Sequence, residues 1–400
     1  MMLGGFQKMS HTDWEVLLAW PSVTVRRRGR HVVADLLHPH HVLSTSARNG
    51  GWSEHVRHLV NHQSCEGSGH EARARLMHEQ GQERYHDTVC REIDLPEDAT
   101  ATMGTAANMN YAAVVVKSDE GVSVAAIVTA GVATNAVCAG DPASWRETPE
   151  GFAKIAAVAG TINTMLLVNT PVAPGALART AITMTEGKSA ALQRLAVPSC
   201  YSADLATGTG TDQFCVAAPR HGGGGSSSAS PLTSASPHMK FGEITGAAVR
   251  DATMEALRWQ NGLESSYTRG LFHALGRYGV REATIFDDLA SSGDGDVTLT
   301  PEDFELLKRN SRSAFYEPLV GASAHALANV LDRIRHGTIP ASTARDALAQ
   351  QAALLAANLA AAPHRWAEFR QRLLRLGTDD PKRVVLAALA LGWGEKWKTR

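Results

Sequence analysis

Short apolar runs separated by turn residues dominate the first half of the chain, and they predict β-strands. The run at 23–37 is split by Gly29, which predicts a hairpin, and Asp-Glu-Gly at 119–121 predicts a second tight hairpin. The predicted strand regions are VTVRRRGRHVVADLL at 23–37, HVLST at 41–45, YAAVVVKS at 111–118, VSVAAIVTAG at 122–131, GTINTMLLVN at 160–169 and DQFCVAA at 212–218.

Helical spacing of apolar residues appears at 173–196 and again at 240–260. Residues 219–237 between them are a low-complexity Gly/Ser/Pro stretch, which predicts a mobile excursion. Strands interleaved with few helices predict an α+β layered domain over residues 1–262, with a mainly antiparallel or mixed sheet and packed helices. Ala/Leu-rich helical segments over residues 263–400 predict a second, all-α domain.

Charge and cysteine usage narrow the function classes. The 400 residues carry 39 Lys and Arg against 40 Asp and Glu, so nothing favours nucleic acid or an anionic membrane as partner. The five cysteines are scattered without a C-x-x-C pair, which argues against a disulfide framework or a zinc ribbon. Since no apolar stretch reaches eighteen residues and the first residues lack an apolar signal core, we expect a cytoplasmic protein without a membrane span.

Polar patches recur at the ends of the predicted strands, where a layered domain can bring them together. The TGTGTD run at 207–212 is the most distinctive, because alternate glycines uncover backbone N–H groups and threonine hydroxyls can donate, accept or attack. Such a loop suits an anion, an oxyanion or an amide. The other patches are STSARNGG at 44–51, TAGVATNAVCAGD at 129–141, GTINT at 160–164, TEGK at 185–188 and HMKFGE at 238–243.

Helical geometry separates two charged candidates. Lys188 lies eleven positions after Leu177, which returns it to the apolar face, so it either snorkels or is held beside a buried partner. Glu186 falls on nearly the opposite face, in solvent unless the helix is covered on both sides. His238, just before a helix, is an acid/base candidate or an exposed linker residue, and Glu243 suits the helix dipole in the first turn.

Metal and nucleophile signatures are weak. In the HPHH tract at 38–41, strand alternation sends His40 and His41 to opposite faces, which argues against a shared metal. The acidic run near 291–304 fails as a calcium loop, because Ala290 and Pro301 occupy its first and last ligand positions. Cys138 and Cys215 lie in apolar runs and are predicted to be buried rather than nucleophilic. No nucleophile elbow, H-E-x-x-H pair or Walker loop is present.

In order and spacing, LSTSARNGG, TAGVATNAVCAGD, GTINTMLLVN, TEGKSAAL, ATGTGTD and HMKFGEITGAAV resemble the adenosylcobinamide amidohydrolase family, CbiZ, over about residues 14–260. This stretch usually has alanine in the family at the position of Gly187. A glycine there is expected to loosen the helix, because a glycine inside a helix lowers its stability by about 1 kcal/mol. The resemblance implies hydrolysis of the amide joining the corrin ring's propionyl side chain to aminopropanol, giving adenosylcobyric acid for coenzyme B12 salvage. It implies no metal and no cofactor.

Joining the resemblance to amide chemistry assigns roles to the matched positions. Thr209 or Thr211 is the nucleophile, Asp212, Asp141 or Glu243 the base, and Lys188 or His238 the acid, with Glu186 a further candidate. The loop N–H groups would hold the oxyanion. Trp52 and Trp145 are candidates to line the broad apolar cleft that a corrinoid needs. The substrate-binding candidates are Asn49, Gly50, Gly51, Thr129, Asn135, Asp141, Thr161, Asn163, Gly208 and Gly210.

Two other interpretations stay open. A corrinoid-binding accessory of salvage or transport would use the same loops without catalysis, and would bind tightly without turnover. A metal-assisted hydrolase built on the histidines would lose activity with a chelator. A homo-oligomer is compatible with either interpretation.

Overall fold

The computed structural model describes residues 13–64, 81, 83–143, 145–148, 151–154, 160–222, 230–292, 297–378 and 380–398. The chain divides into two compact units. The first comprises residues 1–195 and 205–263, and the second comprises 196–204 and 264–400. The short segment 196–204 therefore belongs with the C-terminal helices, although it lies in the sequence between two parts of the first unit.

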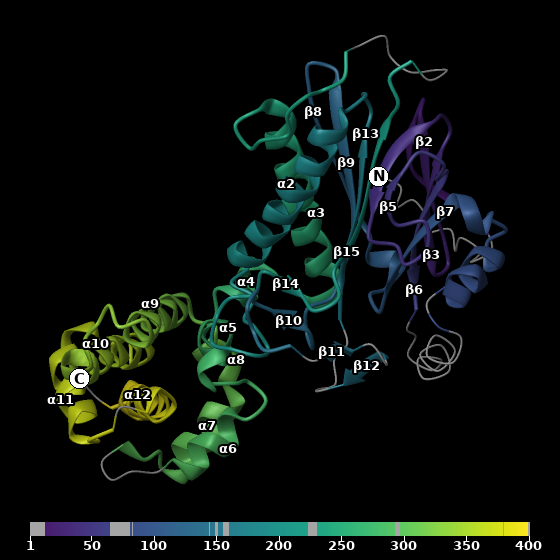
Figure 1. Cartoon of the computed structure of the whole chain (residues 1–400). Coiled ribbons are helices and arrows are strands. Elements are labelled where there is room, and N and C mark those ends of the chain that lie inside the picture. The colour runs from purple at the N-terminus through teal and green to yellow at the C-terminus, as the bar shows by residue number, and fades with distance from the viewer. Residues whose placement is uncertain are drawn as a thin grey trace, which may run out of the picture. The chain divides into compact units, whose positions relative to one another are not determined.

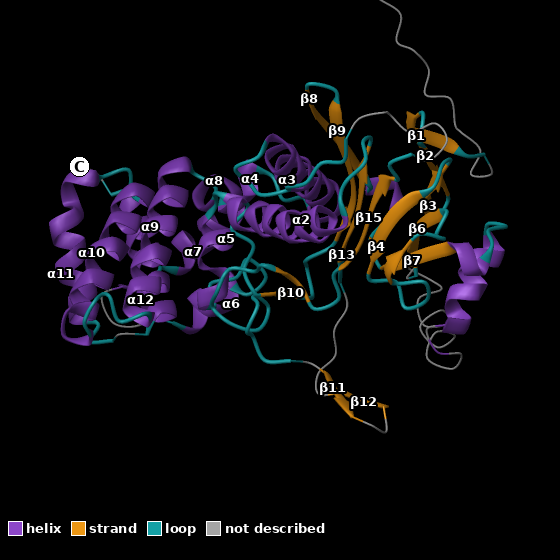
Figure 2. Ribbon diagram, turned by 45° about the horizontal axis from the view of Figure 1, so that its top comes forward, coloured by secondary structure: helices purple, strands orange, loops and turns teal. Residues whose placement is uncertain are grey.

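The first unit contains two β-sheets that face each other (Figure 2). Apolar side chains such as Val25, Met103, Ile127 and Met165 fill the space between them and are almost fully buried. The five-stranded sheet has the order β1 (Glu15–Trp20), β2 (Val23–Arg28), β3 (His31–Leu36), β6 (His58–Gln63), β7 (Thr100–Thr105). The six-stranded sheet has the order β5 (Gly51–Ser53), β4 (His40–Ser44), β15 (Gln213–Pro219), β13 (Ile162–Val168), β9 (Val122–Ala130), β8 (Ala113–Asp119).

Both sheets are mixed, as the sequence predicts. β13 pairs parallel with β15 and β6 pairs parallel with β7, while the other neighbours are antiparallel. The hairpin about Gly29 is confirmed, since that residue has φ 53° between β2 and β3. The second hairpin is also confirmed, because Glu120 and Gly121 both have positive φ between β8 and β9. The α+β class is therefore correct, and the division into two facing sheets is new information.

Helices cover the outer faces of the two sheets. α2 (Pro174–Arg194) and α3 (Lys240–Asn261) lie side by side against the six-stranded sheet (Figure 1). On the other side, helical residues 83–92 bury Tyr85 and Val89 against Val33 and Val60 of the five-stranded sheet. The smaller elements are η1 (Glu97–Ala99), η2 (Met109–Tyr111), the pair β10 (Ala136–Val137) with β14 (Gly208–Thr209), and the pair β11 (Trp145–Thr148) with β12 (Gly151–Lys154).

Part of the low-complexity stretch is anchored, which corrects the predicted mobile excursion. Leu232 forms a bridge with Val172, and its N–H and carbonyl bond to Pro171 and Ala173 at 2.9 Å each. Ala235 is fully buried, and its carbonyl accepts a hydrogen bond from the Thr183 hydroxyl at 2.7 Å. Residues 223–229 lie outside the described residues.

Gly187 lies where α2 crosses α3. The sequence predicts that this glycine only loosens the helix, but the structure gives it a packing role. A Cβ atom at 187 would lie 2.7 Å from the Gly246 carbonyl oxygen, which is rigid helix backbone. The glycine therefore permits the close approach of the two helices.

Gly187→Ala is expected to lower the free energy of unfolding of the first unit by about 1–3 kcal/mol, because the added methyl overpacks this crossing. The matched control is Gly175→Ala in the first turn of α2, where a Cβ would meet nothing within 4 Å. Denaturant unfolding followed by circular dichroism measures both. Equal or greater stability of Gly187→Ala would contradict the close-approach explanation.

The second unit is helical among its described residues. Its core surrounds the fully buried side chains of Phe315, Phe369 and Trp393. Segment 196–204 is attached to it, because Arg335 pairs with Asp204 at 2.6 Å and Arg277 donates to the Ala203 carbonyl at 2.5 Å. Its helices are α4 (Ser265–Thr268), α5 (Leu271–Leu275), η3 (Gly276–Tyr278), α6 (Ile285–Ser291), α7 (Pro301–Arg309), α8 (Ser311–Phe315), α9 (Pro318–Arg335), α10 (Ala341–Leu359), η5 (Pro363–Arg365), α11 (Trp366–Arg375) and α12 (Pro381–Lys396).

Among the described residues, no helix combines the length and the apolar character needed to cross a lipid bilayer.

Candidate active site

The candidate site lies at one edge of the six-stranded sheet, where four strands begin or end. The parallel strands β13 and β15 begin here, and the antiparallel strands β9 and β4 end here. The register places Ile162 opposite Ala130 and Cys215 opposite Ser44. Polar patches that are far apart in the sequence therefore meet at this edge.

The 207–212 loop is held on two sides. Its β14 residues pair with β10, with Thr209 opposite Ala136 and Gly208 opposite Val137. The Thr207 carbonyl accepts from the Ser189 hydroxyl of α2 at 3.0 Å, and the Thr207 hydroxyl accepts from a backbone N–H at 2.9 Å. The loop is thus a fixed element between α2 and the start of β15.

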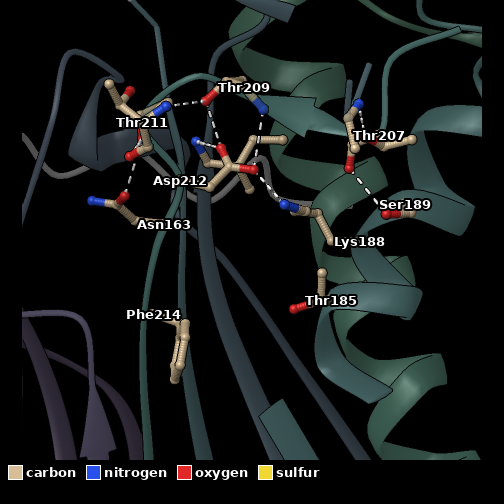
Figure 3. Close-up of polar contacts among 12 residues, drawn as sticks. Asn163, Thr185, Lys188, Ser189, Thr207, Thr209, Thr211, Asp212 and Phe214 are labelled. Carbon is tan, nitrogen blue, oxygen red and sulfur yellow. Dashed lines mark hydrogen bonds and ion pairs between the residues drawn. The ribbon is translucent and has the colours of Figure 1, made fainter. Parts of the chain in front are cut away.

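Asp212 is the centre of the cluster in Figure 3. One carboxylate oxygen accepts from the Thr209 hydroxyl at 2.5 Å and from the Ile162 N–H at 3.0 Å. The other forms an ion pair with the Lys188 ammonium and accepts from the Thr209 N–H at 3.1 Å. Four donors therefore fix one carboxylate against both α2 and β13.

The Lys188–Asp212 pair is mostly withdrawn from solvent. The two side chains keep 14% and 18% of their exposure, and Thr209 as a residue is 7% exposed. Lys188 is therefore held beside a buried partner, the second of the two alternatives that helical spacing allowed. Because the Thr209 hydroxyl donates to the carboxylate, its proton already faces an acceptor, and its oxygen accepts only one long contact, from the Thr211 N–H at 3.5 Å, among the described bonds.

Gly208 is required by the ion pair. A Cβ atom at 208 would lie 2.5 Å from an Asp212 carboxylate oxygen and 2.8 Å from the Lys188 nitrogen. The glycine allows the loop backbone to pass directly over the pair.

Gly208→Ala is expected to reduce turnover by about 10²-fold while leaving the protein folded, because a displacement of about 1 Å in a reacting constellation costs that much. Gly131→Ala at the same sheet edge is the control, since its nearest neighbour would be a Gln260 side-chain carbon at 3.9 Å. Initial rates and circular dichroism spectra of the two variants give the comparison. Normal activity of Gly208→Ala would show that the pair is not part of the reaction.

Thr211 and Gly210 form the exposed rim of the loop. The Thr211 hydroxyl donates to the Gly160 carbonyl at 2.7 Å, and the buried Asn135 amide donates to the same carbonyl at 2.7 Å. From below, the Thr161 hydroxyl donates to the Thr211 carbonyl at 2.6 Å. Asn135 and Thr161 therefore support the loop through backbone atoms.

The loop N–H groups mostly bond within the protein. The Thr209 N–H donates to Asp212, and the Gly210 N–H donates to the Asn135 carbonyl at 3.3 Å. The Thr211 N–H contacts the Thr209 hydroxyl oxygen at 3.5 Å, the longest of these bonds. The Thr211 N–H is therefore the loop donor whose present bond is weakest, so it is the one most easily shifted to a ligand.

Behind the loop, a buried amide network joins the two sheets. The Asn163 amide donates to the Asn61 oxygen at 2.9 Å and to the Gly104 carbonyl at 3.0 Å. The Asn61 amide donates to the Thr129 hydroxyl at 2.8 Å. Asn163, Asn61 and Thr129 are each at most 2% exposed, so they hold strands together and support the loop. Sequence reasoning missed Asn61, whose only signal is its place directly after the apolar pair Leu59 and Val60 in HLVNHQ.

The 44–51 patch also reaches this region, but the side-chain amide of its Asn49 is already hydrogen-bonded within the protein. The Asn49 side chain donates to the carbonyls of Glu97 and Thr100 at 2.8 Å each. At Gly50 a Cβ would lie 2.0 Å from the Ser46 carbonyl oxygen, and Gly51 has φ 74° at the start of β5. These residues shape the turn after β4.

Three predicted catalytic residues, Glu186, His238 and Glu243, make no hydrogen bond or ion pair with the Thr209 cluster among the interactions of the described residues. Asp141 accepts from the Cys138 N–H at 2.8 Å, and Glu243 pairs with Lys240 at 2.9 Å. Glu186 and His238 are exposed.

The two cysteine candidates differ in their burial. Cys215 is fully buried, and burial raises the pKa of its thiol to about 12. Cys138 is half-buried at a turn, so the prediction that it is buried was wrong.

His40 is buried, which lowers its pKa to about 4, while His41 packs against Trp52. No group of three or more His, Cys, Asp and Glu side chains within the described part of the chain could hold a metal ion.

The fold and the site together define an α+β protein of two facing sheets, with a Thr–Asp–Lys cluster at the edge of one of them. Residues 20–265 match the family model for adenosylcobinamide amidohydrolase, CbiZ. The chain belongs to this family, and the predicted resemblance is confirmed. The chain is also 34% identical over 182 residues to an uncharacterized protein of Methanocaldococcus jannaschii. That alignment covers 43% of this chain and 68% of the other protein.

Proposed function

We propose that the protein hydrolyses the amide between the corrin ring's propionyl side chain and aminopropanol in adenosylcobinamide, giving adenosylcobyric acid for corrinoid salvage. Membership of the adenosylcobinamide amidohydrolase family supports the substrate. The observation that carries the chemistry is the Thr209 hydroxyl, which donates at 2.5 Å to a carboxylate fixed by Lys188.

In the proposed first step, the Thr209 oxygen attacks the scissile carbonyl carbon and its proton passes to Asp212. The C–N bond then breaks, Asp212 returns the proton to the departing aminopropanol nitrogen, and an ester on Thr209 remains. Water attacks the ester while Asp212 again accepts a proton. The C–O bond to Thr209 then breaks and Asp212 returns that proton to the Thr209 oxygen, which releases the acid and restores the threonine. No metal or cofactor takes part.

Charge that develops on the carbonyl oxygen needs a donor close to Thr209. The Thr211 N–H is the best placed, because its bond to the Thr209 oxygen is long at 3.5 Å. Gly210 and Thr211 are exposed and contact the substrate in this proposal, while Asn135, Thr161 and Asn163 support the loop from behind. Lys188 holds the carboxylate in place throughout.

The test is incubation of the purified chain with adenosylcobinamide, with and without a chelator, followed by mass analysis of both products. Adenosylcobyric acid and aminopropanol in equal amounts, unaffected by chelator, are expected. A corrinoid that is bound but returned intact would replace the proposal with the binding-accessory function. Loss of product with chelator and recovery with zinc would replace it with the metal-assisted one.

A further inference from the structure

A groove runs along the outward side of α2 beside the start of β15. It encloses about 560 Å³. Ile182 is 49% exposed on its helical wall, and Phe214 stands on the strand side. Its main lining residues are Ile182, Thr185, Glu186, Ser189, Gln193 and Phe214.

The sheet extends this groove into an apolar shelf. Cys215 and Ala217 point into the core between the sheets, so the alternate residues Phe214 and Val216 point toward the α2 side. On the neighbouring strand β4, Leu43 lies opposite Val216 of β15, so Leu43 belongs to the same face of the sheet. Trp52 on the edge strand β5 is opposite Leu43 and is 42% exposed.

Groove and shelf adjoin the Thr209 cluster. Ser189 in the groove wall follows Lys188 directly, and Phe214 comes two residues after Asp212. Figure 3 shows Thr185 on α2 and Phe214 on β15 flanking the space beside the Lys188–Asp212 pair. The groove therefore lies between the same helix and the same strand start that carry Lys188 and Asp212.

We propose that this groove and shelf bind the corrin ring of the substrate, an assignment that rests on the proposed function. A corrinoid is a broad apolar macrocycle edged by amide side chains. Phe214, Leu43 and Trp52 offer apolar area to the ring. The Glu186 carboxylate and the Thr185 and Ser189 hydroxyls offer partners for its peripheral amides.

Continuity with the Thr209 cluster selects the corrin ring over a second copy of the chain as the occupant. The ring and the scissile amide belong to one molecule, so the surface that holds the ring must adjoin the residues that cleave the amide. Glu186 thereby becomes a specificity residue, which explains its exposed position away from Lys188.

The experiment compares Ile182→Glu and Trp52→Ala with Val116→Glu in the full-length chain. Val116 is 42% exposed on β8, at the opposite edge of the same sheet, and serves as the matched control. Steady-state kinetics, equilibrium dialysis with adenosylcobinamide and size-exclusion chromatography are measured for each. The proposal predicts that both groove variants raise KM and Kd by about tenfold, with kcat within threefold and the control unchanged.

Each outcome separates this inference from the proposed function. Hydrolysis with unchanged KM in both groove variants would overturn the corrin surface and leave the amidohydrolase function standing. Absence of hydrolysis with weakened dialysis binding in the groove variants would overturn the function and support the surface. A change of oligomeric state without a change in corrinoid binding would assign the groove to a second copy instead.

Discussion

Thr209→Ala should lower the rate of adenosylcobinamide hydrolysis by about 10³-fold or more, because it removes the only atom that attacks the carbonyl in the proposed mechanism. Thr209 as a residue is 7% exposed, and its hydroxyl donates one short bond to Asp212, so loss of the hydroxyl leaves the loop pairing with β10 intact. The measurement is the initial rate of aminopropanol release at saturating substrate, with KM from the same data.

Three variants make that result interpretable. Thr209→Ser keeps a hydroxyl and should retain measurable activity. Thr211→Ala removes a rim hydroxyl that donates to the Gly160 carbonyl, and should cost about tenfold or less. Thr343→Ala, on an exposed hydroxyl of α10, should have no effect. An active Thr209→Ala beside an inactive Thr211→Ala would move the nucleophile to Thr211.

Lys188→Met should both stop catalysis and destabilise the first unit, because it leaves the Asp212 carboxylate largely buried without its ammonium partner. Removing one member of a buried ion pair costs about 3–5 kcal/mol, and the residual exposure of this pair reduces the expected loss to about 2 kcal/mol. Denaturant unfolding gives the free energy, and the hydrolysis assay gives the rate.

The double variant Lys188→Met/Asp212→Asn should recover part of the lost stability, since it leaves no unpaired charge, and it should stay inactive. Lys240→Met is the control, because Lys240 pairs with Glu243 on the surface of α3 and should not matter measurably to either property. Full activity of Lys188→Met would show that Asp212 works without the lysine. Unchanged stability would show that water replaces the ammonium.

Local patterns in the sequence predicted the hairpins, α2 and α3, and left Lys188 either snorkelling or held beside a buried partner. They did not predict that this partner is Asp212, because the pairing depends on the parallel register of β13 and β15. Asn61 was missed for a similar reason, since its contact with Asn163 exists only because two sheets face each other. Gly187 was interpreted by helix propensity alone, while its surroundings are set by a second helix.

Of the predicted site residues, some meet in space and others do not. Positions within the 207–212 loop and Lys188 meet in space, because the loop connects directly to a strand that α2 covers. His238 and Glu243 lie within a family-matched stretch of the sequence, yet at the start of α3 they are exposed and make no described polar contact with the cluster. The groove residue Phe214 carried no sequence signal, because an aromatic residue in an apolar strand is usually part of the core.

The most direct test of the central claim, amide hydrolysis through an ester on Thr209, is hydroxylamine trapping during turnover. Hydroxylamine competes with water for such an ester, so the account predicts a corrinoid hydroxamate beside adenosylcobyric acid, with the hydroxamate share rising with hydroxylamine concentration. Neither product should form with Thr209→Ala. Adenosylcobyric acid without any hydroxamate would contradict the threonine ester, and adenosylcobinamide recovered intact would contradict the amidohydrolase function itself.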